Sequence, residues 1–220
     1  MEVLRLCFPA NLRRTLEELP KSLDETYNRI LKNINNANSA HAYRLLQCLV
    51  VASRPLHVEE LAEVLAYDFT EGIPTLNVDW RWEDQEAAVL SACASLVSVI
   101  IDNGFRVVQF SHFSVKEFLT SNRLARSTEG VSEFHVSLES AHMTLAQACL
   151  GALLRLGGDT RSSNTHTPLV QYAARHWVTH AQFEHVELGL RDAMEYFFDI
   201  DKPHFLAWLK YMTQVRTVLI

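Results

Sequence analysis

Hydrophobic residues recur at helical spacing along most of this chain, and the first half of the pattern predicts a series of short helices. Residues 11–36 read as helical. Within them, Ser22 and Glu25 have the spacing of a capping box just after Pro20, and the residues that follow form one apolar face. A second helix is predicted from Ser39 to about Ser53, ahead of Pro55, because the residue before a proline is restricted to extended backbone.

Two further helices are predicted before the pattern changes to alternation. The stretch Val58–Tyr67 has apolar residues on one side, and its three glutamates are expected on the outside: Glu59, Glu60 and Glu63. After an irregular segment with Gly72 and Pro74, the pattern predicts a third helix over Trp82–Ala94.

A β-hairpin is predicted directly after these helices. Two β-branched runs, Leu96–Ile101 and Phe105–Ser111, flank the turn residues Asn103 and Gly104. Asn-Gly between such runs is the strongest short-range hairpin signal. Three helices, a hairpin and one closing helix together make a winged helix.

The closing helix begins near a histidine that is a candidate binding residue. Ser114 and Glu117 have capping-box spacing, which predicts Ser114 as the helix cap, and His112 stands just before it. The N-terminus of a helix favours an anion, so His112 could add a hydrogen bond to a phosphate. It could equally be a packing residue bonded to main chain.

The second half of the chain reads as helical throughout. After a polar segment at 127–132, helices are predicted over Leu138–Leu156, from a Thr167-Pro168 start, over Glu187–Phe198 and over Pro203–Gln214. The sequence does not repeat with a period of about 20 to 50 residues, as it would in a repeat array. The fold class expected is therefore mainly α: a winged helix followed by a small helical, superhelical-type domain.

Composition narrows the class of protein. At 220 residues, 48% hydrophobic and with a net charge of −6, the chain has no general basic field for nucleic acid or anionic lipid. No apolar run is long enough for a membrane span. The cysteines are far apart and mostly within apolar runs, which favours buried reduced thiols of a cytoplasmic protein: Cys7, Cys48, Cys93 and Cys149.

Five stretches carry a resemblance to a known family, in the same order along the chain: LPKSLDETYNRIL (19–31), RPLHVEELAEVLA (54–66), ACASLVSV (92–99), VQFSHFSVKEFL (108–119) and PLVQYAARHWVTHA (168–181). They resemble the winged-helix and following helical region of fungal NACHT-type signalling NTPases of the STAND class. They also match the segment described as the GPI inositol-deacylase-type winged helix.

The resemblance implies a division of the chain and one nucleotide contact. It implies a helical tail of the preceding NACHT ATPase region at 1–38, a winged helix at 39–126 and a helical domain at 134–220. In NACHT proteins the histidine of this junction contacts the β-phosphate of ADP in the inactive state, and His112 is the matching residue. ADP and ATP would belong to the intact parent protein, whereas this chain itself is expected to need no cofactor.

The ATPase motif itself is absent from the sequence. No G-x-x-x-x-G-K-[ST] occurs, so we expect a regulatory, non-catalytic segment rather than an enzyme. The expected partners are the NACHT ATPase in cis, protein partners and ankyrin or WD repeats downstream. The alternative is a stand-alone protein-interaction module, or a truncated gene product, without a nucleotide role.

Three other kinds of site are disfavoured. DNA binding is less expected because the third helix and its neighbour are acidic. His176 and His180 have zinc-ligand spacing, but no third ligand is obvious, so a polar stripe beside the core is preferred. No G-x-S-x-G occurs, and with Ser114 as a cap and His112 on a different face we expect no catalytic triad.

The large aromatic side chains are expected in core or interdomain packing rather than in a ligand box. These residues are Trp80, Trp82, Tyr172, Trp177 and Trp208.

Overall fold

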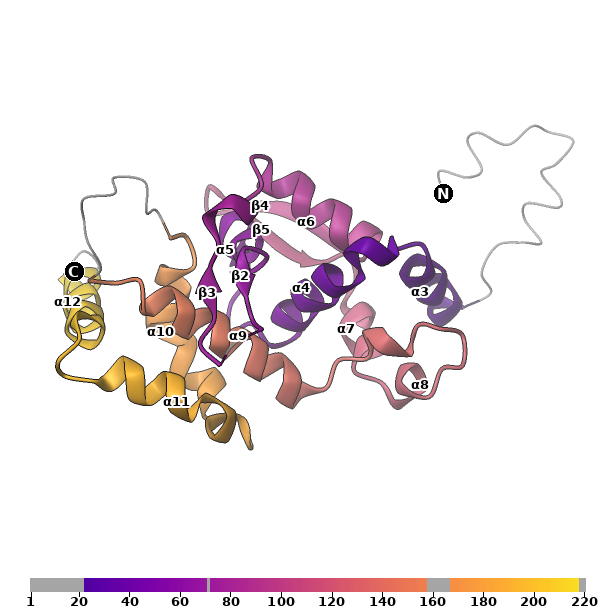
Figure 1. Ribbon diagram of the computed structural model, residues 1–220. Coiled ribbons are helices and arrows are strands. Elements are labelled where there is room, and N and C mark those ends of the chain that lie inside the picture. Colours follow the sequence, from indigo (N-terminus) through magenta and orange to yellow (C-terminus); the bar gives the residue numbers. More distant parts are fainter. Residues whose placement is uncertain (1–21, 71, 158–166, 218–220) are drawn as a thin grey trace, which may run out of the picture.

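The computed structural model describes residues 22–70, 72–157 and 167–217, and it has the winged-helix arrangement that the sequence predicts (Figure 1). Three helices pack against a small antiparallel sheet whose strand order is β1-β5-β4. The helices are α4 (Ser39–Val51), α5 (Val58–Val64) and α6 (Gln85–Cys93); the strands are β1 (Leu56–His57), β4 (Val97–Asp102) and β5 (Phe105–Phe110).

The predicted hairpin is confirmed. Strands β4 and β5 pair from Val97 opposite Phe110 to Asp102 opposite Phe105, which leaves a two-residue loop. Asn103 and Gly104 both have positive φ, 48° and 83°, as a turn of type I′ requires. Strand β1, which the sequence did not predict, adds to the other side of β5 through Leu56 and His57.

The segment between α5 and α6 differs from the prediction. Helix α5 ends at Val64 rather than at Tyr67, and Tyr67 instead belongs to a short second hairpin. That hairpin consists of β2 (Tyr67–Asp68) and β3 (Thr75–Leu76). The side chain of Tyr67 is fully buried, so tertiary packing decides its conformation over local helical preference.

Two elements frame the winged helix at its ends. Helix α3 (Leu23–Lys32) packs on α7 (Phe113–Leu119), and the single-turn α8 (Asn122–Ala125) follows α7. The predicted cap of α3 is confirmed, because Ser22 Oγ accepts a hydrogen bond from the N–H of Glu25 at 3.1 Å. The predicted helical residues 11–21 lie outside the described part of the chain.

Helix α9 (Leu138–Leu153) is central to the second half. It packs on α4 of the winged helix and on α10 (Val170–Ala181) and α11 (Val186–Phe198), while α12 (Pro203–Thr217) covers α10 and α11. The prediction that Thr167 caps α10 with Pro168 at the first position was wrong, because the helix begins at Val170 after Leu169.

One continuous hydrophobic core joins the winged helix to these helices, and the domain boundaries proposed from the sequence stay a prediction. Three thiols are buried and free: Cys48, Cys93 and Cys149. Cys7 lies outside the described residues. Among the helices that the structure describes, none has both the length and the apolar composition needed to cross a membrane.

Candidate functional site at the junctions of the winged helix

His112 lies at the junction of β5 and α7, as predicted, and its ring bonds to main chain, as one of the two expectations for it had it. The imidazole itself is the cap: Nδ1 accepts from the N–H of Ser114 at 3.3 Å. The ring is exposed and packs beside Phe113, with ring centroids 4.3 Å apart. Because Nδ1 accepts, the hydrogen of a neutral ring lies on Nε2, which is then a donor.

Ser114 does not cap the helix, so that prediction was wrong. Its hydroxyl lies 2.7 Å from Nδ1 of His112 and 2.7 Å from the hydroxyl of Tyr27 on α3. The expectation that Ser114 and His112 occupy different faces was also wrong. A hydroxyl beside an imidazole resembles two members of a nucleophile–base–acid triad. Among the described residues, however, no hydrogen bond or ion pair joins this ring to an orienting carboxylate.

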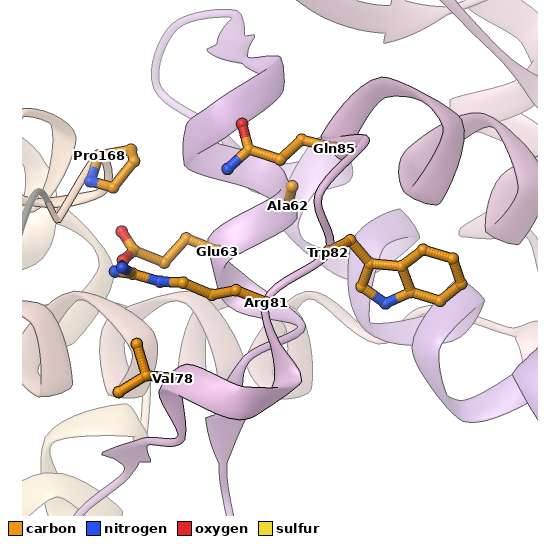
Figure 2. Close-up of a pocket in the computed structure, with 7 residues that line it drawn as sticks. All are labelled: Ala62, Glu63, Val78, Arg81, Trp82, Gln85 and Pro168. Carbon is orange, nitrogen blue, oxygen red and sulfur yellow. The ribbon is translucent and has the colours of Figure 1, made fainter. Parts of the chain in front are cut away.

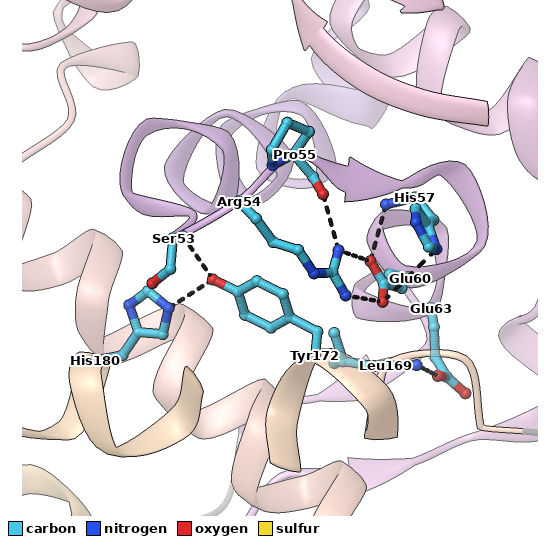
Figure 3. A network of polar contacts seen from close by, with 9 residues as sticks. All are labelled: Ser53, Arg54, Pro55, His57, Glu60, Glu63, Leu169, Tyr172 and His180. Carbon is cyan, nitrogen blue, oxygen red and sulfur yellow. Dashed lines mark hydrogen bonds and ion pairs between the residues drawn. The ribbon is translucent and has the colours of Figure 1, made fainter. Parts of the chain in front are cut away.

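Helix α5 carries two buried carboxylates, although all three of its glutamates were predicted on the outside. Glu60 and Glu63 are each 2% exposed. The Arg54 guanidinium donates two hydrogen bonds to the Glu60 carboxylate, of 2.7 and 2.6 Å. The N–H of His57 donates to the same carboxylate at 2.9 Å (Figure 3). These bonds replace the lost hydration of the buried charge.

Glu63 connects the winged helix to α10. Its carboxylate is paired with Arg81 and accepts the N–H of Leu169 at 2.8 Å, at the start of α10 (Figures 2 and 3). Burial raises the pKa of Glu63, while the Leu169 N–H and Arg81 oppose that rise. A side chain of one part of the molecule therefore satisfies a free backbone donor at a helix terminus of the other.

A chain of hydrogen-bonded polar groups lies beside the Glu63–Leu169 contact. Tyr172 on α10 accepts from the N–H of Ser53 at 3.0 Å, and its hydroxyl lies 2.7 Å from Nε2 of His180. Nδ1 of His180 lies 2.9 Å from Nδ1 of His142 on α9. One assignment satisfies every donor: the Tyr172 hydroxyl donates to His180, and His180 donates to His142.

This chain of neutral groups explains the histidine spacing that suggested zinc. Burial lowers the pKa of His180 to about 4, and His142 adds to the effect. The ring of His176 packs against that of Tyr172, tilted by 40° and with centroids 4.8 Å apart. Within the described residues, no group of three or more His, Cys, Asp or Glu side chains could hold a metal ion.

The aromatic residues fall into two groups, and the prediction for them was partly wrong. Tyr172 and Trp177 are buried, and Trp208 is partly buried. Trp80 and Trp82 are instead 48% and 57% exposed. They line a hollow of about 720 Å³, and Trp82 also borders a smaller pocket of about 310 Å³ beside Glu63 and Arg81 (Figure 2).

The acidic face that argued against DNA binding is smaller than predicted. On α5 the one glutamate that is not buried is Glu59, which is partly exposed and shares Arg106 with Glu86 of α6. Near the start of α6, Glu83 and Asp84 are exposed. The absence of DNA binding therefore stays a prediction that depends on the third helix and not on Glu60 or Glu63.

The sequence placed His112 correctly at the start of α7 but gave no indication of the buried network. The signal for Glu60 was present, because an arginine six residues earlier and an N-terminal helix position both favour a carboxylate there. No local signal indicated Glu63, whose partners Arg81 and Leu169 are distant in sequence.

Comparisons with known proteins agree with the fold. The chain is 28% identical over 204 residues to the "Azaphilone pigments biosynthesis cluster protein L" of Monascus ruber, an alignment that covers 89% of this chain and 42% of that protein. The chain thus spans less than half the length of this relative. No solved structure gives a significant match. The model of the GPI inositol-deacylase winged helix domain matches residues 27–137, just over half of the chain, and the chain belongs to that family.

Proposed function

We propose that this chain is the regulatory, non-catalytic segment of a NACHT-type signal-transduction NTPase. In this proposal it packs on the ATPase region in cis, holds the ADP-bound inactive state and provides protein contacts. Two findings support it: membership of the winged helix family, and similarity to part of a fungal protein more than twice as long as the aligned region. Exchange of ADP for ATP would shift the protein between two arrangements, because each nucleotide binds one arrangement more tightly than the other.

The observation that carries the proposal is the hydrogen bonding of His112. Ser114 engages Nδ1, so Nε2–H of the exposed ring remains a donor of fixed tautomer. Such a donor suits a phosphate oxygen. In the proposed resting state, Nε2–H of His112 donates to the β-phosphate of ADP.

A second contact offers a route from the nucleotide to the preceding chain. Tyr27 on α3 bonds the same Ser114 hydroxyl that positions His112, at 2.7 Å. Tyr27 is buried and its ring packs on Phe118 of α7, with centroids 5.3 Å apart. A displacement of α3 would therefore alter the support of the His112 ring, which couples the segment before the winged helix to the phosphate contact.

The test uses the full product of the gene, once the transcript has been read outward from both ends of this coding segment. A hydrogen bond to a charged group contributes about 1.5–3 kcal/mol, so His112→Ala should speed ADP release roughly 10- to 100-fold. His112→Gln, whose amide N–H can replace Nε2–H, should restore part of the retention. His185→Ala is the matched control, because that histidine is also exposed.

The outcomes separate the proposal from its alternative. Faster ADP release with His112→Ala alone supports the phosphate contact. Equal off-rates for His112→Ala and wild type contradict it. A full product that contains no P-loop contradicts the regulatory role in cis and favours a stand-alone protein-interaction module.

A further inference from the structure

Two tryptophans next to the third helix of the winged helix are exposed to solvent and do not contribute their full surface to the core. Trp80 and Trp82 keep 48% and 57% of their surfaces in solvent. Arg81 between them has extended backbone, φ −72° and ψ 132°, so its neighbours project to the side opposite its own side chain. Figure 2 shows Trp82 pointing away from the Arg81–Glu63 pair.

The anchoring of Arg81 makes this arrangement a fixed feature. Its guanidinium pairs with Glu63, which is 2% exposed and also holds the start of α10. The ion pair therefore fixes the backbone of the segment from inside. The two indoles are left facing solvent on a stretch whose position is set by buried groups.

Both indoles line the same hollow, of about 720 Å³, and we call its lining the tryptophan surface: His41, Leu65, Asp79, Trp80, Arg81 and Trp82. Exposed aromatic groups around a concavity of this size are typical of a binding site. Tryptophan is also the residue most enriched among side chains that dominate binding energy.

The charge around the tryptophan surface is negative. Asp79, Glu83 and Asp84 are exposed within the same short segment. The two arginines of this region are already paired with carboxylates, because Arg81 pairs with Glu63 and Arg106 pairs with Glu59 and Glu86. Indole faces attract cations, most strongly among aromatic rings, and carboxylates beside them add to the attraction.

We propose that the tryptophan surface binds a lysine- or arginine-bearing segment of a protein partner. The aliphatic stem of such a side chain packs on an indole, while its charged end meets the Asp79 side of the hollow. The charge complementarity favours a basic segment over an acidic or purely apolar one. The proposal does not involve His112 or a nucleotide, so it stands or falls independently of the regulatory function proposed above.

The test is a titration followed by nuclear magnetic resonance of the indole N–H groups. The probes are short blocked peptides of leucine and glycine that differ only in carrying lysine, arginine, glutamine or glutamate. The chain has four tryptophans. Trp177 is 3% exposed and Trp208 donates its indole N–H to Ala174 at 3.0 Å, so both are internal references. The lysine and arginine peptides should shift the Trp80 and Trp82 signals alone.

Variants then locate the binding. Trp80→Ala and Trp82→Ala should each weaken binding of the cationic peptides about two- to fivefold, as expected for an exposed cation–π contact. Asp79→Asn should weaken it and reduce its dependence on salt. Leu188→Ala on α11 is the control, because Leu188 is 61% exposed and should have no effect.

Two results would overturn the proposal. One is that neither cationic peptide shifts the Trp80 and Trp82 signals at millimolar concentration. The other is that the glutamine or glutamate peptide binds as tightly as the lysine peptide, which would assign the surface to apolar or acidic partners instead.

Discussion

The hydroxyl of Tyr172 lies 2.7 Å from Nε2 of His180, and both side chains have no exposed surface. The two residues are eight positions apart on α10, and the hydroxyl also receives the N–H of Ser53 at the end of α4. This contact therefore joins the winged helix and the helical region through two fully buried side chains, and its removal leaves polar atoms without these partners.

Replacing Tyr172 tests that contact. Tyr172→Phe keeps the ring but leaves the Ser53 N–H and His180 Nε2 unsatisfied, so the free energy of unfolding should fall by about 1–3 kcal/mol. Tyr196→Phe is the control, because Tyr196 is 40% exposed. Urea unfolding followed by circular dichroism measures both, and an equal loss for the two variants would contradict the role of the buried hydroxyl.

The buried histidines predict loss of stability in acid. The pKa of His180 is about 4 in the folded chain against an ordinary 6.5, so the unfolded chain binds more protons between those values. The contribution is present above about pH 6.5 and is lost as pH falls towards 4, by at most about 3 kcal/mol. Burial lowers the pKa of His142 and His176 as well, in the same direction.

The comparison variant for this pH dependence is His180→Gln, which cannot titrate. Urea unfolding at several pH values should give a shallower acid decline for His180→Gln than for wild type. The raised pKa of Glu63 acts in the opposite direction, because the folded state then takes up a proton more readily. The difference between the two curves isolates His180, and identical slopes would rule out its contribution.

Neighbouring glutamates on α5 should differ sharply when neutralised. Glu60→Gln removes the charge that meets two Arg54 hydrogen bonds inside the protein, and it should lower the free energy of unfolding by roughly 1.5–3 kcal/mol. Glu59→Gln removes an exposed ion pair with Arg106, so its loss should stay below about 1 kcal/mol. A double-mutant cycle with Arg54→Gln measures the coupling, which should be absent for Glu59.

Two helical glycines give a matched pair of packing variants. A Cβ on Gly151 of α9 would lie 2.8 Å from the Tyr67 ring and 2.9 Å from the Pro74 carbonyl, so Gly151→Ala forces α9 away from the second hairpin. It should destabilise the protein by about 1–3 kcal/mol. Gly189→Ala meets mainly the flexible end of Met143 and gains helical preference, so it should be neutral or stabilising. Thermal unfolding distinguishes the two.

The elements that sequence reasoning predicted well are those with a local cause. The Asn103-Gly104 loop requires positive φ at both residues, and few residues other than these tolerate it, so the hairpin was predictable. The Ser22 cap depends on a residue three positions away. Helix α5 was placed correctly at its start but extended too far, because burial of Tyr67 in a hairpin depends on distant contacts.

The parts of the candidate site that were missed depend on distant partners. A charged residue is expected on the surface unless a counter-charge is known, and Glu63 finds its partner 18 residues later and its helix N–H 106 residues later. The cap of α7 is His112 and not the predicted Ser114, whose hydroxyl is instead hydrogen-bonded to Tyr27, 87 residues away. Position along the chain located His112, but the assignment of its ring nitrogens required the fold.

The bond between Glu63 and the N–H of Leu169 also has a consequence for the order of events during synthesis. During translation, Glu63 is added to the chain 106 residues before Leu169. Until then the carboxylate lacks one of the hydrogen bonds that offset its burial, so the nascent winged helix is held in a weakened form. Translation of α10 therefore completes the first half of the protein, and a ribosome that stalls ahead of this helix exposes an unfinished fold to proteases.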